Sequence, residues 1–300
     1  MSTSIQIVTP GDLIVEDDSG FLRGHGTYSV EGRLYASVCG VVERVNKLIS
    51  VVPLKSRYQG HVGDVVVGRV QEVGNKRWKV DINSNQDAVL LLSAINLPGG
   101  VQRRRTYEDQ LNMRHFFVED DLISAEVQQF FQQDGSMALQ TRSTRYGKLK
   151  HGQLIEVSPS LIKRCKQHFH SFAEYGVDMV LGLNGYIWLT PTRIAAMMTI
   201  QAERDTEESV IAESAGGTSL SRIQAESKTI TKEEREALCR VRNAISALAS
   251  QFILVSPETI SDVVDDSLQM SLSVVEMLDP SRAQELTARA ASRRQSDFYS

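Results

Sequence analysis

Short apolar runs that alternate with polar residues, and that end at glycines, fill the first part of the chain. The runs DLIVEDDSGFLRGHGTYSV and RLYASVCGVVERVNKLISVVPL have the period of two that is typical of strands, in which every second side chain lies on one face of a sheet. The glycines between the runs provide turns. This pattern predicts a small all-β domain over residues 1–58.

A second group of β-type runs begins at Gly60. These runs are GDVVVGRVQEV, KRWKVDI, AVLLLSAI, DDLISAEVQQFF and MALQTRS, with turn residues between them. Five short strands in this order predict a small closed barrel of the OB type over residues 59–147. The segment between the third and fourth runs, NLPGGVQRRRTYEDQLNMRHFFVE, is too long for a tight turn, and long loops of this kind often carry binding contacts.

Strand and helix patterns are mixed over residues 148–255, which predicts an α+β domain. In SPSLIKRCKQHF a helix is expected to begin with Ser158 as its cap and Pro159 in its first turn. Thr231 and Glu234 form a capping-box pattern, so a further helix is expected there. Its apolar stripe, at helical spacing, is Leu238, Val241, Ile245 and Leu248.

Two less regular segments complete the chain. Acidic residues with little apolar periodicity predict a mobile excursion at about residues 200–230. Residues 256–300 predict a helical extension that Pro280 breaks or restarts. The sequence therefore predicts a multidomain protein that is mainly β, with an N-terminal β domain, an OB-type barrel and a C-terminal α+β domain with a helical tail.

The stretch Gly182-Leu183-Asn184-Gly185 matches the G-x-x-G loop with which KH modules clamp an RNA backbone. Clamping loops join two helices and commonly present a basic residue, whereas here strand-like runs flank the loop and its two middle residues carry no charge. Asn184 and Gly185 both tolerate positive φ, which favours a tight turn. We therefore predict a structural hairpin turn in which Gly182, Asn184 and Gly185 are the important residues.

Composition is that of a folded protein from a reducing compartment. The hydrophobic fraction of 41% is ordinary, and the three cysteines, Cys39, Cys165 and Cys239, are far apart and odd in number, which argues against a disulfide framework. The amino terminus lacks the pattern of a signal peptide, and no apolar run approaches the length of a membrane span. Cytosol or nucleus is expected.

The net charge of -4 is unevenly distributed. Between residues 44 and 105 the chain has 11 Lys and Arg against 4 Asp and Glu, and between residues 141 and 170 it has 7 against 1. A solvated charged face would explain either stretch alone. Two such stretches in one chain favour RNA as a partner.

Residues with the chemistry of a metal or catalytic site are sparse in the sequence. Cys165, His168 and His170 are close together, but a zinc site needs three or four ligands and no second Cys or His pair has a useful spacing. His25 lies between two glycines and is expected in a structural turn. Nucleophile motifs, a phosphate-binding loop and paired carboxylates are not evident, so no metal or cofactor is expected and a nuclease is disfavoured.

The order of a β domain, an OB-type barrel and a G-x-x-G loop resembles the RNA-binding cap subunits of the eukaryotic RNA exosome. The resemblance runs from about residue 9 to residue 190 and is looser beyond residue 200. Its motifs are GFLRGHGTY, ERVNKLI, GDVVVGR, KRWKVDINS, NLPGG, DLISAEVQ, TRSTRYGKL, VSPSLIKR and GLNGYIW.

This resemblance implies a non-catalytic subunit with an N-terminal domain, an S1-type OB barrel and a KH domain. Members of the family lie with the other cap subunits on a ring of RNase PH-like subunits, and they pass RNA 3′ ends through a channel to separate hydrolytic nucleases. Ribosomal RNA maturation, messenger RNA turnover and RNA surveillance are implied, in the nucleus and nucleolus and also in the cytoplasm, with no membrane partner. The alternative is a free-standing S1/KH RNA-binding module in translation or RNA metabolism.

Basic residues at three places are expected to contact RNA phosphates. Lys76 and Lys79 occupy positions where S1-type barrels commonly have stacking aromatics, with Trp78 between them, and lysines there would hold phosphates without sequence preference. For the arginines in the long loop between the third and fourth barrel strands, the alternative to RNA binding is a salt-bridged surface with Glu108 and Asp109. For the basic residues at the end of the last barrel strand and beyond it, the alternative partner is an acidic ring subunit. The further candidates are Arg103, Arg104 and Arg105 in the loop, and Arg142, Arg145, Lys148 and Lys150 at the end of the last barrel strand and in the linker into the KH domain.

Overall fold

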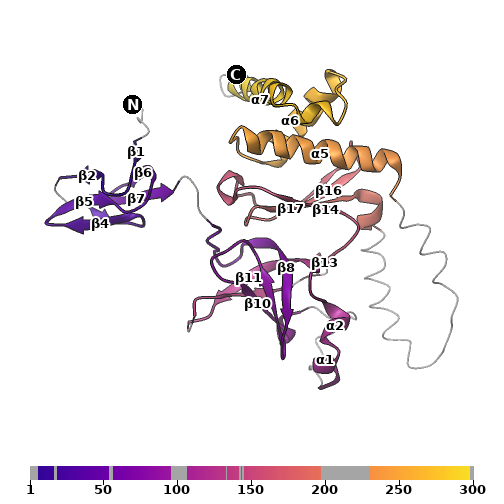
Figure 1. Ribbon diagram of the computed structural model, residues 1–300, viewed down its shortest axis with the longest axis horizontal. Helices are drawn as coiled ribbons and strands as arrows, with labels where there is room; N and C mark the ends of the chain where they lie inside the picture. The colour runs from indigo at the N-terminus through magenta and orange to yellow at the C-terminus, as the bar shows by residue number, and fades with distance from the viewer. Residues whose placement is uncertain are drawn as a thin grey trace. The chain divides into compact units, whose positions relative to one another are not determined.

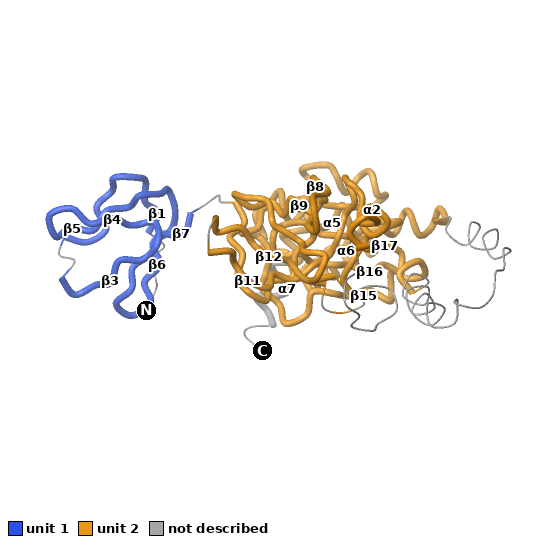
Figure 2. Tube along the Cα trace, turned by 90° about the horizontal axis from the view of Figure 1, so that it is seen from below, with its two compact units in different colours: residues 1–56 blue, residues 57–300 orange. Residues whose placement is uncertain are grey.

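The computed structural model divides the chain into two compact units, residues 1–56 and residues 57–300 (Figure 2). It describes residues 6–16, 19–53, 57–95, 107–132, 134–141, 143, 145–196 and 230–297. Each unit has its own hydrophobic core. Within the described residues, no helix is long and apolar enough to span a bilayer.

The N-terminal unit is all β in its described part, as the alternating pattern predicts. One sheet has the order β1-β6-β7-β3 and the other the order β2-β5-β4. The strands are β1 (Ile7–Val8), β2 (Leu13–Val15), β3 (Leu22–Arg23), β4 (Thr27–Val30), β5 (Arg33–Ala36), β6 (Gly40–Val45) and β7 (Leu48–Pro53).

Alternation along β7 shows how the sequence positions the core of this unit. Ile49 and Val51 point inward and are buried, whereas Leu48 and Val52 lie on the other face and are exposed. Among the described residues, the buried core cluster of this unit is Val8, Ile14, Leu34, Ala36, Ile49 and Val51.

The barrel predicted by the second group of β runs is confirmed (Figure 1). Its strand order is β12-β10-β9-β8-β11-β13, and β12 also pairs with β11, which closes a ring of five strands. The strands are β8 (Val65–Val73), β9 (Arg77–Asp81), β10 (Ala88–Leu91), β11 (Leu122–Phe130), β12 (Met137–Gln140) and β13 (Gly147–Leu149).

Trp78 on β9 fills the barrel interior. It is fully buried, its Nε1 donates to the carbonyl oxygen of Phe117 at 3.1 Å, and the two rings meet edge to face with centroids 5.5 Å apart. Phe117 follows α2 (Met113–Phe116), which with α1 (Tyr107–Leu111) belongs to the long connection between β10 and β11. The indole therefore closes the barrel against this connection and is not available for stacking on a base.

A four-stranded antiparallel sheet follows, in the order β14-β17-β16-β15. The helix α5 packs against β16 and β17, and α6 and α7 pack against α5 (Figure 1). Residues 192–196 are also helical. The elements are β14 (Gln153–Glu156), β15 (Phe169–Phe172), β16 (Val177–Leu181), β17 (Tyr186–Pro191), α5 (Lys232–Ser250), α6 (Pro257–Gln269) and α7 (Pro280–Asp297), with single 3-10 turns at Leu92–Ala94, Pro159–Leu161 and Glu276–Leu278.

The helix predicted to begin at Ser158 is wrong. Only a 3-10 turn, Pro159–Leu161, forms there, and Ser158 makes no capping bond; its hydroxyl lies 2.9 Å from that of Ser160. Lys163 N then donates to the carbonyl oxygen of Val255, and the chain continues in an irregular, extended course to β15. A long-range backbone pairing has replaced the local helical bonds.

The later helix predictions are confirmed. Thr231 caps α5 with a complete capping box to Glu234, and the predicted apolar stripe is buried. Pro280 begins α7 and so restarts the helical tail. The acidic excursion predicted at about residues 200–230 lies almost entirely outside the described residues.

Candidate nucleic-acid interface

The turn between β16 and β17 connects the sheet to the barrel. Residues 182–185 form the hairpin turn expected from the sequence, and Gly182 N donates to the carbonyl oxygen of Tyr186 at 3.0 Å. Leu183 N donates to the carbonyl oxygen of Val65 on β8, also at 3.0 Å. Leu183 is only 8% exposed, so the tip of this hairpin faces the barrel and not the solvent.

Asn184 is fully buried and bonds to two barrel segments. Its Oδ1 accepts from Val67 N at 3.3 Å, and its Nδ2 donates to the carbonyl oxygens of Val67 at 2.6 Å and Ile82 at 2.9 Å. The side-chain amide thus satisfies barrel backbone groups that have no strand partner at this point. Gly185 has a φ of +89°, and a Cβ there would lie 2.2 Å from the carbonyl oxygen of Val157, so glycine is required.

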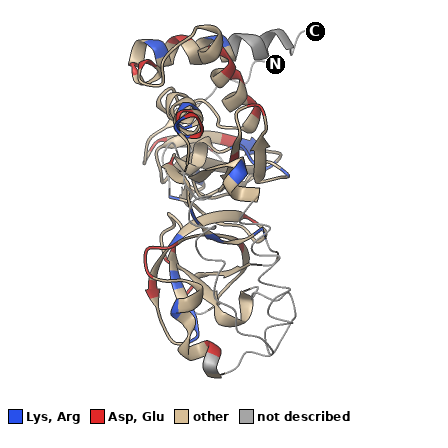
Figure 3. Cartoon of the chain, turned by 90° about the vertical axis from the view of Figure 1, so that its right-hand side faces the viewer, with Lys and Arg blue, Asp and Glu red and all other residues tan. Residues whose placement is uncertain are grey.

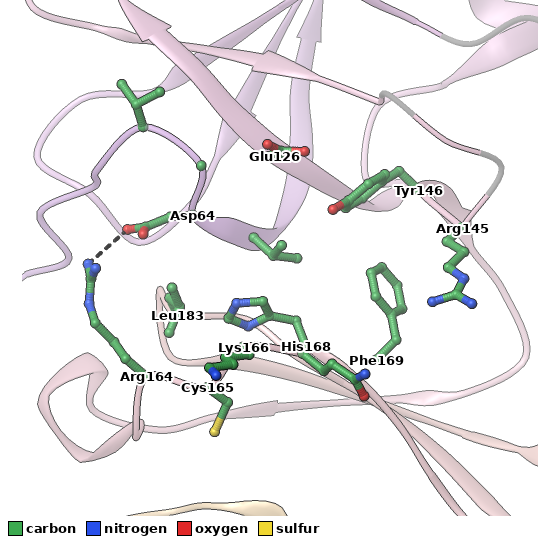
Figure 4. Close-up of a pocket in the computed structure, with 14 residues that line it drawn as sticks. Asp64, Glu126, Arg145, Tyr146, Arg164, Cys165, Lys166, His168, Phe169 and Leu183 are labelled. Atoms are coloured by element: carbon green, nitrogen blue, oxygen red, sulfur yellow. Dashed lines mark hydrogen bonds and ion pairs between the residues drawn. The ribbon is translucent and has the colours of Figure 1, made fainter.

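A buried carboxylate forms a second link between barrel and sheet. Asp64 accepts hydrogen bonds from Tyr58 Oη at 2.7 Å and from His61 N at 2.9 Å. It also accepts one from Arg164 Nη2 at 3.2 Å (Figure 4). Burial and then the hydrogen bond to Asp64 raise the pKa of Tyr58 well above its ordinary value of 10.0, so Tyr58 stays a donor. Arg164 belongs to the segment that leads into β15.

A cavity of about 490 Å³ is lined by residues of both links, and we name it the seam cavity (Figure 4). Arg145, Tyr146 and Phe169 lie together on one side of it, and Arg164 pairs with Asp64 on the other. Lys166 and Glu126 complete its charged lining. Basic groups outnumber acids in the cavity, and one of the two acids is already paired.

His168 projects into the middle of the seam cavity (Figure 4). Burial lowers the pKa of its imidazole below the ordinary 6.5, and Nδ1 lies 3.1 Å from the carbonyl oxygen of Leu181. The ring is therefore neutral near pH 7, and the positive charge of the cavity comes from Arg145, Arg164 and Lys166. Of these, only Arg164 has a salt bridge to another described residue.

A second cavity, of about 530 Å³, adjoins the first and is named the sheet cavity. The two cavities share Arg145, Tyr146 and Phe169 as lining residues. Lys148 and Lys150 also line the sheet cavity, and Lys148 Nζ forms an ion pair with Asp121. Three of the predicted RNA-binding residues, Arg145, Lys148 and Lys150, are thus brought to one place.

Lys76 and Lys79 belong to a different part of the barrel surface. Lys76 is exposed in the β8–β9 turn with a φ of +60°, and Lys79 Nζ lies 2.7 Å from Glu72 Oε2. Figure 3 shows basic and acidic residues interspersed over the barrel strands. Four other candidates, Arg103, Arg104, Arg105 and Arg142, lie outside the described residues.

The basic and aromatic residues of the seam cavity that were not candidates in the sequence analysis are Tyr146, Arg164, Lys166 and Phe169. The basic count over residues 141–170 included the two charged ones, so a signal was present. The aromatic pair had no such signal, because the predicted helix around residue 165 would have placed Phe169 elsewhere. Its actual position follows from β15 pairing with β16.

The Cys165, His168 and His170 group does not form a metal site. His168 turns to the carbonyl oxygen of Leu181, His170 Nε2 lies 3.0 Å from the carbonyl oxygen of Gln167, and Cys165 Sγ lies 3.4 Å from that of Lys163. In the part of the chain that the structure describes, no group of three or more His, Cys, Asp or Glu side chains is arranged to hold a metal ion.

Comparisons with known proteins identify the family. Family models described as "Exosome complex exonuclease RRP4 N-terminal region", "RRP4, S1 domain" and "KH domain" match residues 7–45, 57–129 and 152–194. The chain is 45% identical to the exosome complex component RRP4 homolog of Arabidopsis thaliana over 92% of this chain and 83% of that protein. It is 46% identical to exosome complex component RRP4 of Bos taurus (96% and 89%) and 44% identical to that of Saccharomyces cerevisiae (89% and 77%). The chain therefore belongs to the RRP4 family of exosome complex components.

Proposed function

We propose that this chain is a non-catalytic, RNA-binding cap subunit of the RNA exosome that guides RNA 3′ ends into the ring channel and stabilises the ring of RNase PH-like subunits. The observation that carries the proposal is the 46% identity to a named exosome component over 96% of the chain. Processing and degradation of RNA from the 3′ end would follow in the nucleus, nucleolus and cytoplasm.

A non-catalytic role is supported by how the carboxylates near the seam are used. Asp64 accepts hydrogen bonds from Tyr58 and Arg164, and Asp121 forms an ion pair with Lys148. Asp178 Oδ1 accepts from the hydroxyls of Ser171 and Thr192 at 2.6 and 2.8 Å. Carboxylates committed to the fold in this way are poor ligands for the divalent ions of a nuclease. The word "exonuclease" in the description of the matching N-terminal family model is part of that model's name and does not by itself assign nuclease activity to this chain.

Two surfaces would serve the two kinds of partner. For RNA, we propose phosphate contacts from Lys76, Lys79, Arg145, Lys148 and Lys150, and from Arg103, Arg104, Arg105 and Arg142. Exposed Lys76, Arg145 and Lys150 have no ion pair to another described residue, so they should contribute most.

For the ring, we propose the solvent side of the β1-β6-β7-β3 sheet, named the outer sheet face. Its exposed apolar side chains form cross-strand neighbours, with Ile7 and Val52 both opposite Val41, and Leu48 opposite Val45 and Leu22. Ile7 and Leu22 are each 63% exposed and Val45 is 55% exposed. An apolar face of this kind on a soluble domain marks a site of protein association.

Affinity purification of the full-length chain tests the proposal. RNase PH-like subunits and other cap subunits should co-purify in equal amounts, whereas their absence would favour a free-standing S1/KH module. The purified chain, incubated with end-labelled RNA and a divalent metal, should leave the RNA intact. Reproducible shortening from the 3′ end would contradict the non-catalytic assignment.

A further inference from the structure

The floor of the sheet cavity is a row of large apolar side chains across three strands. Phe169 on β15 is opposite Val180 on β16, and Val180 is opposite Trp188 on β17. The neighbouring row, Met179 and Leu189, belongs to the core that the helices cover. Because side chains alternate between the faces of a sheet, the Phe169 row faces away from α5.

Tyr146 extends this apolar floor into the wall between the two cavities. Its ring meets that of Phe169 edge to face, with centroids 5.4 Å apart and planes at 75°. Both rings are only partly buried and line both cavities. Aromatic side chains on a sheet surface are the means by which other RNA-binding modules hold unstacked bases.

The rim of the sheet cavity is basic. Arg145 and Lys150 are exposed, and neither side chain has an ion pair to another described residue. The acid in the lining, Asp178, is engaged by Ser171 and Thr192. Beyond the shared aromatic wall, Lys166 adds positive charge in the seam cavity, where Arg164 is already paired with Asp64.

We propose that the sheet cavity holds one base of a single-stranded RNA against Tyr146 and Phe169, that Arg145 and Lys150 contact the adjacent phosphates, and that the strand continues into the seam cavity along Lys166. The inference rests on the proposed function because it takes RNA as the ligand. It adds a binding site for a base, which the distribution of charge alone does not predict. Volumes of about 490 and 530 Å³ are large enough to accommodate single nucleotides. An acidic peptide would use the basic rim but not the ring faces, so RNA fits better.

The test measures binding of fluorescein-labelled oligouridine to the full-length chain, alone and assembled with its ring subunits. The charge variant carries both Arg145→Glu and Lys150→Glu, which reverse two exposed charges. The second variant is Tyr146→Leu, which removes the aromatic ring but keeps an apolar side chain. Lys232→Glu, whose side chain is 89% exposed on α5, and Phe252→Leu, at a residue that is 83% exposed, are the matched controls.

We expect the charge variant to bind at least about tenfold more weakly at low salt and to show a shallower salt dependence, by about 0.7 for each lost phosphate contact. Tyr146→Leu should lower the affinity about tenfold with little change in the salt slope, because it removes stacking and not charge. The controls should bind like the wild type. With 4-thiouridine in the RNA, ultraviolet crosslinks should map to Tyr146 or Phe169.

Three results would overturn the inference. One is unchanged affinity in both variants. Another is weaker RNA binding by the charge variant together with unchanged RNA affinity of Tyr146→Leu, since the aromatic wall would then hold no base. The third is loss of ring assembly with RNA affinity of the free chain intact, since the cavity would then be a protein-docking site. Failure of the wild-type chain to assemble would instead count against the proposed function, because RNA binding by the free chain is read separately.

Discussion

One side chain, Asn184, satisfies backbone groups of two barrel segments. Replacing Asn184 by Ala would leave buried groups of Val67 and Ile82 without partners. We expect the free energy of unfolding of Asn184→Ala to fall by roughly 2–4 kcal/mol, because each lost buried bond leaves a desolvated group unsatisfied. Urea denaturation of the full-length chain measures it.

The control for this change is Asn75→Ala, at an exposed position in the β8–β9 turn. It should leave stability nearly unchanged. Equal midpoints for the two variants would mean that water or a shifted backbone replaces the amide of Asn184, and the hairpin would then not be what holds the sheet to the barrel.

The pH dependence of stability tests the neutral imidazole in the seam. Because burial lowers the pKa of His168 in the folded chain below its ordinary 6.5, the folded state binds fewer protons than the unfolded chain once the pH falls below that value. Stability is therefore lost as the pH falls. Melting temperatures measured between about pH 7.5 and about pH 5.5 should decrease less in His168→Gln than in the wild type. His115→Gln, at an exposed residue on α2, should follow the wild type.

At this scale the sequence predicts what is local and not what is distant. A tight turn at Asn184 and Gly185 could be predicted, because positive φ is a preference of the residues themselves. The partners of Asn184 could not be predicted, because Val67 and Ile82 are 117 and 102 residues away in the sequence. Lys79 similarly fitted a phosphate contact by residue type, but its neighbour across the strands, Glu72, already pairs with it.

Among the elements, α5 and the segment after Ser158 show when a helix signal is reliable. The α5 sequence combines a capping box with an apolar stripe over 19 residues, and both signals agree. The segment after Ser158 had a cap residue and a proline but no apolar stripe to bury. A start signal alone was overridden by the backbone pairing of Lys163 with Val255.

The cap of α5 also joins this helix to the end of the sheet. Glu234 accepts from Thr231 N at 2.9 Å and from Arg193 Nε at 2.7 Å and Nη2 at 3.1 Å, and the bonds to Arg193 and then to Thr231 lower its pKa to about 2. Replacing Glu234 by Ala should lower the free energy of unfolding by about 1–2 kcal/mol, the usual contribution of a cap. Chemical denaturation near pH 7 measures this effect.

The dependence of stability on pH in the acid range provides a second measurement on Glu234. A carboxyl with a lowered folded pKa contributes stability above its ordinary 4.5 and loses it as the pH falls toward 2. The difference between the wild type and Glu234→Gln should therefore shrink as the pH falls below about 4.5. Glu236→Gln, on the exposed side of α5, should show only a small difference at any pH. A constant difference for Glu234→Gln would assign its effect to packing.

For the whole molecule, the domain order could be predicted from the sequence but the seam could not. The barrel strands and the helices could be predicted because each has a hydrophobic periodicity that is visible within a short window of sequence. The seam depends on Asp64 meeting Arg164, 100 residues later, and on the hairpin tip meeting β8. Neither residue type is unusual for a solvated surface, so nothing in the local pattern marks them as partners.

Assembly is the property that belongs to the chain as a whole, and the outer sheet face gives it a test. Val52 is 49% exposed and opposite Val41 on this face, so Val52→Asp should fold normally in the free chain. Within a protein interface the new carboxylate would be buried without a partner, which is strongly unfavourable. We expect co-purified RNase PH-like subunits to fall at least about tenfold, while the melting temperature and the oligouridine affinity of the free chain stay unchanged. Val30→Asp is the matched control, because Val30 is 48% exposed in the same unit but lies in the other sheet. If Val30→Asp impairs assembly and Val52→Asp does not, the ring contacts the β2-β5-β4 sheet and the outer sheet face is not the docking surface.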